Sequence, residues 1–256
     1  TLSSYNFNHY RLGGKAGLAK TFDDFSFLDF SLFVLHRQVP DSLALNYLSA
    51  GCEGSFFGFY EKNELDIFLR LEHRNYNKPD NLDDYYRCEL DGRHKITVIK
   101  DFCTRQELEL ELAFFDEKDL INQDYTRFSP TIQAGIQLGD IGLWLGSKFE
   151  YLAEQEKDYL ESTESYLEYG LKADIDIIQA GCFFGTAESL TGYRNLKYEN
   201  DLQSNFSFER LNLIADWNFY KSFNFNILFS AEWEWHENKA ENSQIFLLSS
   251  GLSYSF

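Results

Sequence analysis

The chain has 256 residues and a formal net charge of −18 at pH 7, and this length suits one large domain or two small ones. The acidic balance argues against nucleic acid as a partner, because phosphate binding requires a basic patch and the sequence shows none. A mean hydropathy of −0.40 and the lack of an apolar run near the roughly 18 residues required exclude a transmembrane helix, whereas a transmembrane β-strand needs only about 10 alternating residues.

The composition is uniform along the chain, with no Pro/Gly/Ser-rich linker, so we expect one domain over residues 1–256. The chain begins at Thr1 without a signal peptide, and we expect a processed or trimmed form. Its four cysteines show no CxxC spacing, which argues against a zinc site, while a Cys52–Cys88 disulfide stays open. The acidic loops lack the residue order of an EF-hand. No metal and no cofactor is predicted.

Apolar and polar residues alternate in one stretch after another. In residues 64–74, ELDIFLRLEHR, charged residues alternate with Leu65, Ile67, Leu69 and Leu71. The pattern returns at 106–115, 128–138, 143–154, 167–177 and 223–237. Because successive side chains of a strand point to opposite sides, each stretch predicts a strand with one apolar and one polar face.

Short and long connections alternate between these stretches. Tight turns are predicted at 39–42, 61–64, 101–104, 138–142, 178–181 and 220–223. The intervening connections, such as DEKDLINQDYTR and EQEKDYLESTES, are longer and mostly acidic. Short turns at one end of the strands and long loops at the other are typical of bacterial outer-membrane barrels, whose short turns face the periplasm.

This rule predicts about fourteen strands, with twelve or sixteen as the nearest alternatives. An even number returns both termini to one side, as single-chain barrels of this class require. The expected strands lie at 8–20, 25–38, 43–50, 54–62, 64–75, 93–101, 105–116, 127–138, 141–155, 165–178, 180–193, 204–220, 223–237 and 243–256.

The end of the chain, SQIFLLSSGLSYSF, has an aromatic last residue, Phe256, with Tyr254 and Leu252 two and four places before it. This ending resembles the C-terminal signal of bacterial outer-membrane β-barrel proteins. The resemblance is to the class, including small monomeric porins, and to no single family. It implies an integral protein of the Gram-negative outer membrane, inserted by the outer-membrane assembly machinery through its last strand.

A sheet that spans lipid has to satisfy every backbone group, so its edges have to close. We therefore expect an all-β, closed, antiparallel up-and-down barrel with apolar rows facing lipid and polar rows facing the lumen. The aromatic content of 18% then fits girdles at the two water–lipid boundaries. The predicted girdle residues are Trp217, Phe219, Trp233, Trp235, Tyr254 and Phe256.

The polar rows predict a hydrated lumen, because so many charges are costly to bury dry. Acidic residues outnumber basic ones there, which predicts a channel for small polar solutes or ions that prefers cations. Some of these charges have a structural reading as cross-strand pairs, such as Arg210 with Glu232 or Glu234. The predicted pore-lining residues are Asp66, Arg70, Glu72, Lys95, Glu107, Glu109, Glu111, Lys148, Glu150, Glu168, Lys172, Asp174, Asp176, Arg210, Asp216, Glu232 and Glu234.

Three alternatives stay open. Bulky inward residues such as Trp144, Ile214 and Leu228 fit a non-conducting barrel that serves as scaffold in an envelope complex. An outer-membrane hydrolase rests only on His236 near Glu234, a weak signal, and we expect no enzyme. A soluble β-sandwich would bury the aromatics in a core, but strict alternation of turn length weighs against it.

Overall fold

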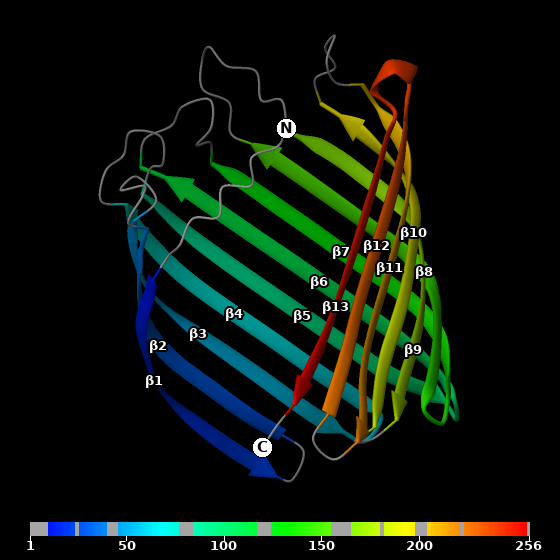
Figure 1. Ribbon diagram of the computed structural model, residues 1–256. Helices are drawn as coiled ribbons and strands as arrows, with labels where there is room; N and C mark the ends of the chain where they lie inside the picture. Colours follow the sequence, from blue (N-terminus) through cyan, green and yellow to red (C-terminus); the bar gives the residue numbers. More distant parts are fainter. Residues whose placement is uncertain are drawn as a thin grey trace. The chain divides into compact units, whose positions relative to one another are not determined.

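A computed structural model describes residues 10–23, 26–39, 46–76, 84–116, 124–154, 165–179, 182–197, 204–220 and 223–254. This part of the chain holds 13 β-strands of 12 to 15 residues, drawn from blue to red in Figure 1. Their bounds are β1 Tyr10–Asp23, β2 Ser26–Gln38, β3 Tyr47–Tyr60, β4 Asn63–Tyr76, β5 Tyr85–Ile99, β6 Phe102–Phe115, β7 Tyr125–Leu138, β8 Ile141–Glu154, β9 Tyr166–Gln179, β10 Phe183–Leu196, β11 Phe206–Tyr220, β12 Phe223–His236 and β13 Ser243–Tyr254.

The strands form one sheet in which spatial order follows sequence order from β1 to β13. Tight turns join β3 to β4 at 61–62, β5 to β6 at 100–101 and β7 to β8 at 139–140. Each of these turns has a residue at positive φ, namely Glu61, Lys100 and Gly139, as hairpin turns that match the strand twist require. The all-β class is thus confirmed, and these turns overlap those predicted at 61–64, 101–104 and 138–142, although residues 102–104 belong to β6.

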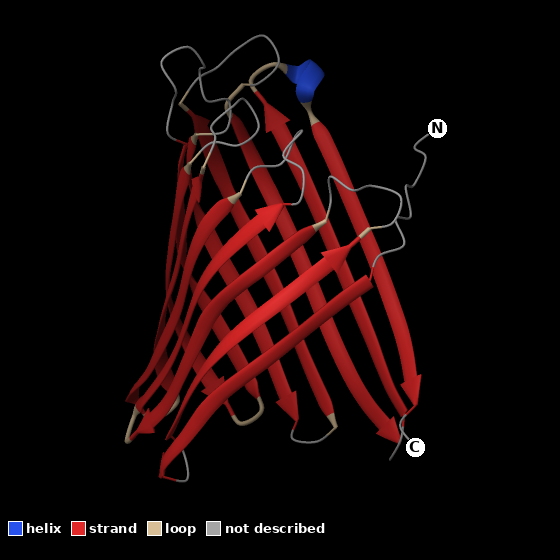
Figure 2. Cartoon of the chain, turned by 90° about the vertical axis from the view of Figure 1, so that its left-hand side faces the viewer, coloured by secondary structure: helices blue, strands red, loops and turns tan. Residues whose placement is uncertain are grey.

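One short 3₁₀ turn, η2 (Lys239–Glu241), lies between β12 and β13 and is blue in Figure 2. Asn238 caps it by accepting a hydrogen bond from the backbone N–H of Ala240. No helix within the described ranges is long and apolar enough to cross a membrane.

The chain divides into two compact units. Unit 1 comprises Thr1–Arg93, Leu108–Phe128 and Leu152–Ser162, and unit 2 comprises His94–Glu107, Ser129–Tyr151 and Thr163–Phe256. Unit 1 therefore holds β1 to β4, and unit 2 holds β9 to β13. All contacts described below lie within one unit or the other.

Two of the expected strands are wrong. Residues 43–50 and 54–62 were expected as separate strands, but β3 runs unbroken from Tyr47 to Tyr60. Gly51 lies inside this strand and pairs with Phe33 of β2, and a Cβ on it would meet the Phe33 ring at 2.8 Å and the Leu71 carbonyl oxygen at 2.0 Å. The glycine makes room for a ring inside the sheet rather than ending the strand.

The start of β5 is also corrected. The expected strand began at residue 93, whereas β5 begins at Tyr85 and includes YYRCELDG. The described residues therefore hold 13 strands, not the expected 14. Most of the turn predicted at 39–42 lies outside the described residues, as do parts of those at 178–181 and 220–223.

All four cysteines are free thiols. Cys52 lies on β3 and Cys88 on β5, with β4 between them. Strands two places apart are separated by about 10 Å, beyond the roughly 7 Å that a disulfide can bridge. The open question of a Cys52–Cys88 disulfide is answered against it.

Candidate functional site: the polar face of the sheet

Buried and exposed side chains alternate along the strands, but here the polar side chains are buried and the apolar ones are exposed. Along β7, Ser129, Thr131 and Gln133 are buried, while Ile132 and Ile136 between and beyond them are exposed. A soluble sheet would bury the isoleucines. We call the side that carries Gln133 the polar face and the side that carries Ile132 the apolar face.

The cross-strand registers extend these faces across β9 to β12. Lys172 pairs with Leu190, Leu190 with Arg210, and Arg210 with Glu232. Because paired residues point to the same side of a sheet, Lys172, Arg210 and Glu232 share the polar face. The predicted pore-lining residues of β9 to β12 that lie on this face are Glu168, Lys172, Asp174, Asp176, Arg210, Asp216, Glu232 and Glu234.

The most buried cation of the polar face is Arg105 on β6, whose side chain is 4% exposed. Its guanidinium donates to Asp174, to Asp176 Oδ2 at 3.2 Å and to Gln133 Oε1 at 2.6 and 3.0 Å. Gln133 Nε2 in turn donates to Asp174 Oδ2 at 2.9 Å. Removal of a charge from water is costly unless partners surround it, and three strands, β6, β7 and β9, supply those partners here.

Lys172 extends this cluster toward β10. Its ammonium lies 2.8 Å from Glu188 Oε2 and 3.8 Å from both Asp174 Oδ2 and Glu107 Oε2. The Trp144 ring closes the other side of the cluster, with its centroid 4.6 Å from the Arg105 guanidinium carbon. We call this set the Arg105 network; its members are Arg105, Glu107, Gln133, Trp144, Lys172, Asp174, Asp176 and Glu188.

A second cluster surrounds Glu168 of β9, a residue that is 2% exposed. One carboxylate oxygen accepts from Arg194 at 2.6 and 2.9 Å, and the other from Arg210 at 2.7 Å. Arg210 also donates to Glu232 Oε1 at 2.6 Å and faces it across β11 and β12. The predicted Arg210–Glu232 pair is confirmed. Phe208 packs against the Arg210 guanidinium at 4.1 Å.

Unit 1 repeats this arrangement around Glu72 of β4. The Glu72 carboxylate accepts from Arg74 at 2.8 Å, from Arg70 at 2.9 Å and from the Ser49 hydroxyl at 2.7 Å. The Arg70 guanidinium carbon lies 4.7 Å from the Phe33 ring centroid, the ring for which Gly51 makes room.

A second carboxylate of unit 1, Glu111, also has partners on neighbouring strands. Its Oε1 lies 2.8 Å from Arg87 Nε in an ion pair and accepts a hydrogen bond from the Tyr125 hydroxyl at 2.5 Å. Together with Glu72, it shows that many charges of the polar face are held by neighbouring strands.

Other predicted residues on the polar face meet water more directly. Asp66 is exposed, and Glu109 is 54% exposed and 3.7 Å from Arg127. Lys95 Nζ lies 3.4 Å from Gln137 Oε1, and Glu150 accepts from Tyr166 at 2.6 Å and lies 3.4 Å from Lys148. The predicted set therefore contains both saturated and exposed charges.

His236 lies at the far end of β12 between two carboxylates. Nε2 is 3.4 Å from Glu234 and Nδ1 is 3.5 Å from Glu241. Ser204 and Ser243 donate their hydroxyls to Glu241 and Glu234, not to the imidazole. The serine–histidine hydrogen bond of a hydrolase is thus missing among these described residues, and the absence of enzymatic activity stays a prediction.

Glu241 lies in the connection outside the strands. Burial acts to raise its pKa, but hydrogen bonds from the Ser204 hydroxyl, the Asn238 amide and the Ser204 backbone N–H outweigh this and lower the pKa below the usual value. The carboxylate therefore fastens the β12–β13 connection to the residue range before β11. Within the described residues, no group of three His, Cys, Asp or Glu side chains is placed to hold a metal ion.

Sequence reasoning missed the central residue of the site. Arg105 was placed at the first position of an expected strand and was not assigned to the lumen, and Arg87, Glu89, Glu188 and Arg194 were also not predicted as site residues. The signal was present for Arg105, because it stands two residues before Glu107 in the same alternation. For Arg87 and Glu89 it was hidden by the late start given to β5.

The apolar face carries the aromatic residues at two levels. Trp217 pairs with Phe225 near the β11–β12 turn, and Trp233 and Trp235 stand at the other end of β12. Phe225 and Trp233 are eight residues apart, about 27 Å at the usual rise of about 3.4 Å per residue. On strands tilted by roughly 35–45° this corresponds to about 20 Å along the bilayer normal, somewhat less than the roughly 25 Å apolar band of transmembrane barrels. Tyr254 is exposed beside Phe223, whereas the side chains of Phe219 and Phe256 lie outside the described residues.

Comparison with known proteins gives remote structural likeness. No family model matches the chain, and no curated protein matches it. OmpT, an outer membrane protein of Vibrio cholerae, is 8% identical with a TM-score of 0.45, over 96% of this chain and 95% of that chain. CdiB from Escherichia coli is 10% identical with a TM-score of 0.49; the match covers 95% of this chain, which spans 56% of CdiB. The translocator domain of autotransporter NalP from Neisseria meningitidis is 11% identical with a TM-score of 0.28, over 97% and 87% of the two chains.

These TM-scores lie below 0.5, so the assignment rests on the strands themselves. They are long enough to span a bilayer, which takes about 9 to 11 residues, and their apolar faces are exposed to the surroundings. This is the strand pattern of a bacterial outer-membrane β-barrel protein. It locates the chain in that membrane.

Proposed function

We propose that the sheet closes into a barrel and that the chain is an outer-membrane channel for small polar solutes, with a preference for cations. The observation that carries the proposal is the polar face, on which charged side chains recur in both units while most of the exposed aliphatic side chains lie on the opposite side. Closure removes the unpaired edges that lipid does not tolerate. The polar face then surrounds water.

The exposed acids, and not the buried ones, are expected to set the preference for cations. Glu72, Glu168 and Asp174 are each held by arginine, so their fields are largely neutralised at short range. Asp66 and Glu109 meet solvent and can attract a passing cation, as rings of acidic side chains do in other channels.

Ion selectivity in a planar bilayer tests this function. A salt gradient across the purified chain should give a reversal potential of cationic sign, which Asp66→Asn combined with Glu109→Gln should move toward zero. Glu209→Gln is the matched control, because Glu209 is an exposed acid on the opposite face of β11. Preference for anions in the unchanged protein would refute the proposal.

One observation favours the scaffold alternative. Leu190, Phe206 and Phe208 are buried together on the polar face of unit 2, where they take up space that a wide channel would leave to water. The same bilayer measurement decides, since a scaffold inserts without conducting. Phospholipid hydrolysis in detergent tests the remaining expectation, that the chain is not an enzyme.

A further inference from the structure

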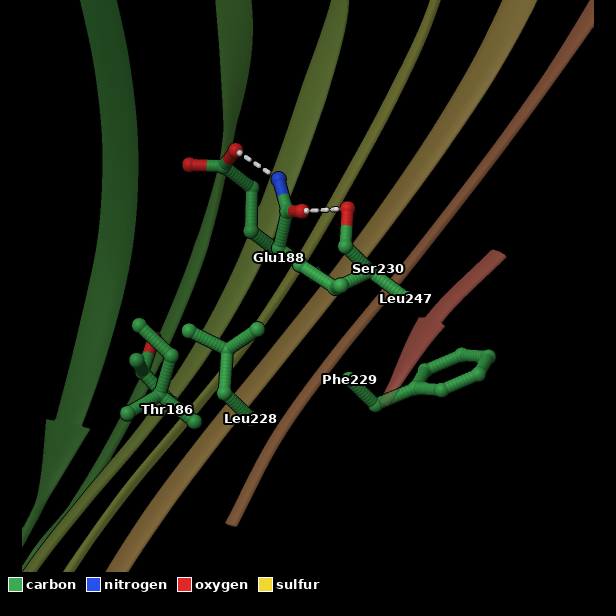
Figure 3. A pocket seen from close by; sticks show the side chains of 8 residues that line it. Thr186, Glu188, Leu228, Phe229, Ser230 and Leu247 are labelled. Carbon is green, nitrogen blue, oxygen red and sulfur yellow. Dashed lines mark hydrogen bonds between the residues drawn. The ribbon is translucent and has the colours of Figure 1, made fainter. Parts of the chain in front are cut away.

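The polar face of unit 2 contains a cavity at the place where its charged strands meet aliphatic ones. Two cross-strand rows of the polar face line it, Glu188, Asn212, Ser230 and Leu247 in one and Thr186, Ile214 and Leu228 in the other, and Phe229 of the apolar face also borders it. Figure 3 shows Glu188, Ser230 and Leu247 above Thr186 and Leu228. The cavity measures about 380 Å³, within the usual range of roughly 300–1,000 Å³ for small-molecule sites.

One half of the cavity is aliphatic although it lies on the polar face. Leu247 is 55% exposed, and Ile214 and Leu228 are exposed beside it; Ile245, in the next row, is exposed as well. We call these four residues the aliphatic patch. Apolar surface in contact with water favours any apolar group that covers it, and such a patch among charged residues marks a binding surface.

The other half of the cavity presents hydrogen-bond acceptors. The Ser230 hydroxyl donates to Asn212 Oδ1 at 2.8 Å, and Asn212 Nδ2 donates to Glu188 Oε1 at 3.2 Å. The Thr186 hydroxyl donates to Asp176 Oδ1 at 3.0 Å. Both hydroxyls have thus committed their single hydrogen, and what they and Glu188 still offer are oxygen lone pairs. A ligand here is expected to be a donor.

The charge around the cavity also favours a ligand that donates hydrogen bonds and is positively charged. Arg105 and Lys172 between them contact four carboxylates, namely Glu107, Asp174, Asp176 and Glu188. Asp174 faces Glu188 across the β9–β10 pair and is 5% exposed, yet its Oδ1 is buried without a hydrogen-bond partner. Arg105 and Lys172 thus supply two positive charges to four carboxylates.

We propose that this cavity binds small amphipathic ammonium ions, with the hydrocarbon part on the aliphatic patch and the ammonium toward Glu188 and the Ser230 and Thr186 oxygens. The inference deepens the proposed function and rests on it, since a solute reaches the polar face through the lumen. It assigns the channel a preferred class of cation: a primary or secondary amine that carries a compact apolar group.

The direct test is calorimetric titration of the full chain in detergent micelles with phenethylammonium. Two probes of the same shape serve as controls, the neutral 2-phenylethanol and the anionic 3-phenylpropionate. We expect phenethylammonium to bind, 2-phenylethanol to bind about tenfold more weakly and 3-phenylpropionate not to bind. No binding of phenethylammonium, or equal binding of 3-phenylpropionate, overturns the inference.

Three variants locate the site. Glu188→Gln keeps the shape of the side chain and should weaken phenethylammonium binding about tenfold. Leu228→Ser should weaken phenethylammonium and 2-phenylethanol alike, because it removes apolar contact. Glu209→Gln, on the opposite face, should change neither. Heat-modifiable mobility on a denaturing gel confirms that each variant folds, and unchanged binding in folded Glu188→Gln would refute the site.

Conductance measured on the same samples separates this inference from the proposed function. If the chain conducts but does not bind phenethylammonium, the proposed channel function stands and the cavity is refuted as a binding site. If the chain binds phenethylammonium with the variant pattern above but never conducts, the cavity stands as a cation site and the channel function is refuted.

Discussion

The Arg105 network and the aliphatic patch lie on the same face of the same unit, and each reverses the usual relation between polarity and burial. In the network, Asp174 is 5% exposed and the Arg105 side chain 4%. In the patch, Leu247 is 55% exposed. Charges are buried where strands supply partners from both sides, whereas Leu247 and Ile245 are uncovered on β13, the last strand of the described sheet, which pairs only with β12.

The comparison separates the residues of the polar face that stabilise the sheet from those that can contact a solute. A buried, saturated charge contributes to the alignment of β6, β7 and β9 and has little field left for the lumen. An exposed leucine contributes little to the fold, because its surface stays in water. Prediction of function from a count of charged residues is therefore misleading in this protein, since its most conspicuous charges are paired.

Substitution of Arg105 is expected to have the largest effect. Arg105→Gln leaves the buried Asp174 and the half-buried Asp176 without the guanidinium that joins them, and loss of one partner from a buried pair costs about 3–5 kcal/mol of unfolding free energy. Urea unfolding in lipid vesicles measures this loss. Lys15→Gln is the control, because the Lys15–Glu53 pair has a lysine that is 53% exposed, and it should cost less than about 1 kcal/mol. Equal losses would show that water solvates the network.

A second comparison sets the two faces against each other at equal exposure. Ile132 lies at the middle of β7 on the apolar face and is 61% exposed, close to the 55% of Leu247 on the polar face. Ile132→Arg should lower the unfolding free energy by about 2–4 kcal/mol, since an arginine at the bilayer midplane is costly. Leu247→Arg should change it by less than about 1 kcal/mol, as surface substitutions in water do.

Unfolding in vesicles of the same lipid checks both variants of this pair. If Ile132→Arg were as mild as Leu247→Arg, the apolar face would lie in water, and the transmembrane assignment would be wrong. If both were severe, the patch would lie in an apolar medium and the cavity on the polar face would not be open to solutes.

Much of the fold could be predicted from the two-residue period of the sequence, because apolar and polar residues alternate along each membrane strand. β7 and β8 were predicted to within two residues at each end, and counting outward from the β11–β12 turn placed Arg210 opposite Glu232 or Glu234, of which the register selects Glu232. The same reasoning divided β3 into two strands, whereas β3 runs through Gly51, a small residue that fits against Phe33.

The site was harder to predict than the strands. Alternation assigns a residue to a face but says nothing of which neighbours saturate it. Arg105 donates to Asp174, a partner 69 residues away, and to Gln133, 28 residues away, so only the relative stagger of β6, β7 and β9 brings them together. Ile214 and Leu228 were expected as bulky inward groups, but their junction with Leu247 in one cavity depends on the β12–β13 register.

The smallest predicted effect concerns Glu241, a carboxylate that accepts several hydrogen bonds, as Asp174 does, but lies in the connection outside the strands. Its pKa is lowered by the Ser204 and Asn238 hydrogen bonds, so the contribution to stability is complete above the ordinary carboxyl pKa and is lost as pH falls through the lower pKa of the folded chain. The Ser204 backbone N–H, 3.0 Å from Glu241 Oε2, should report this in an NMR titration with a midpoint below that of a free glutamate. Glu241→Gln should abolish the titration and lower the urea stability at neutral pH only slightly, because the contact ties only the β12–β13 connection. A midpoint at or above that of a free glutamate would mean that burial outweighs the hydrogen-bond donors of Glu241. Glu241 and the carboxylates of the Arg105 network would then differ only in how strongly burial acts on them.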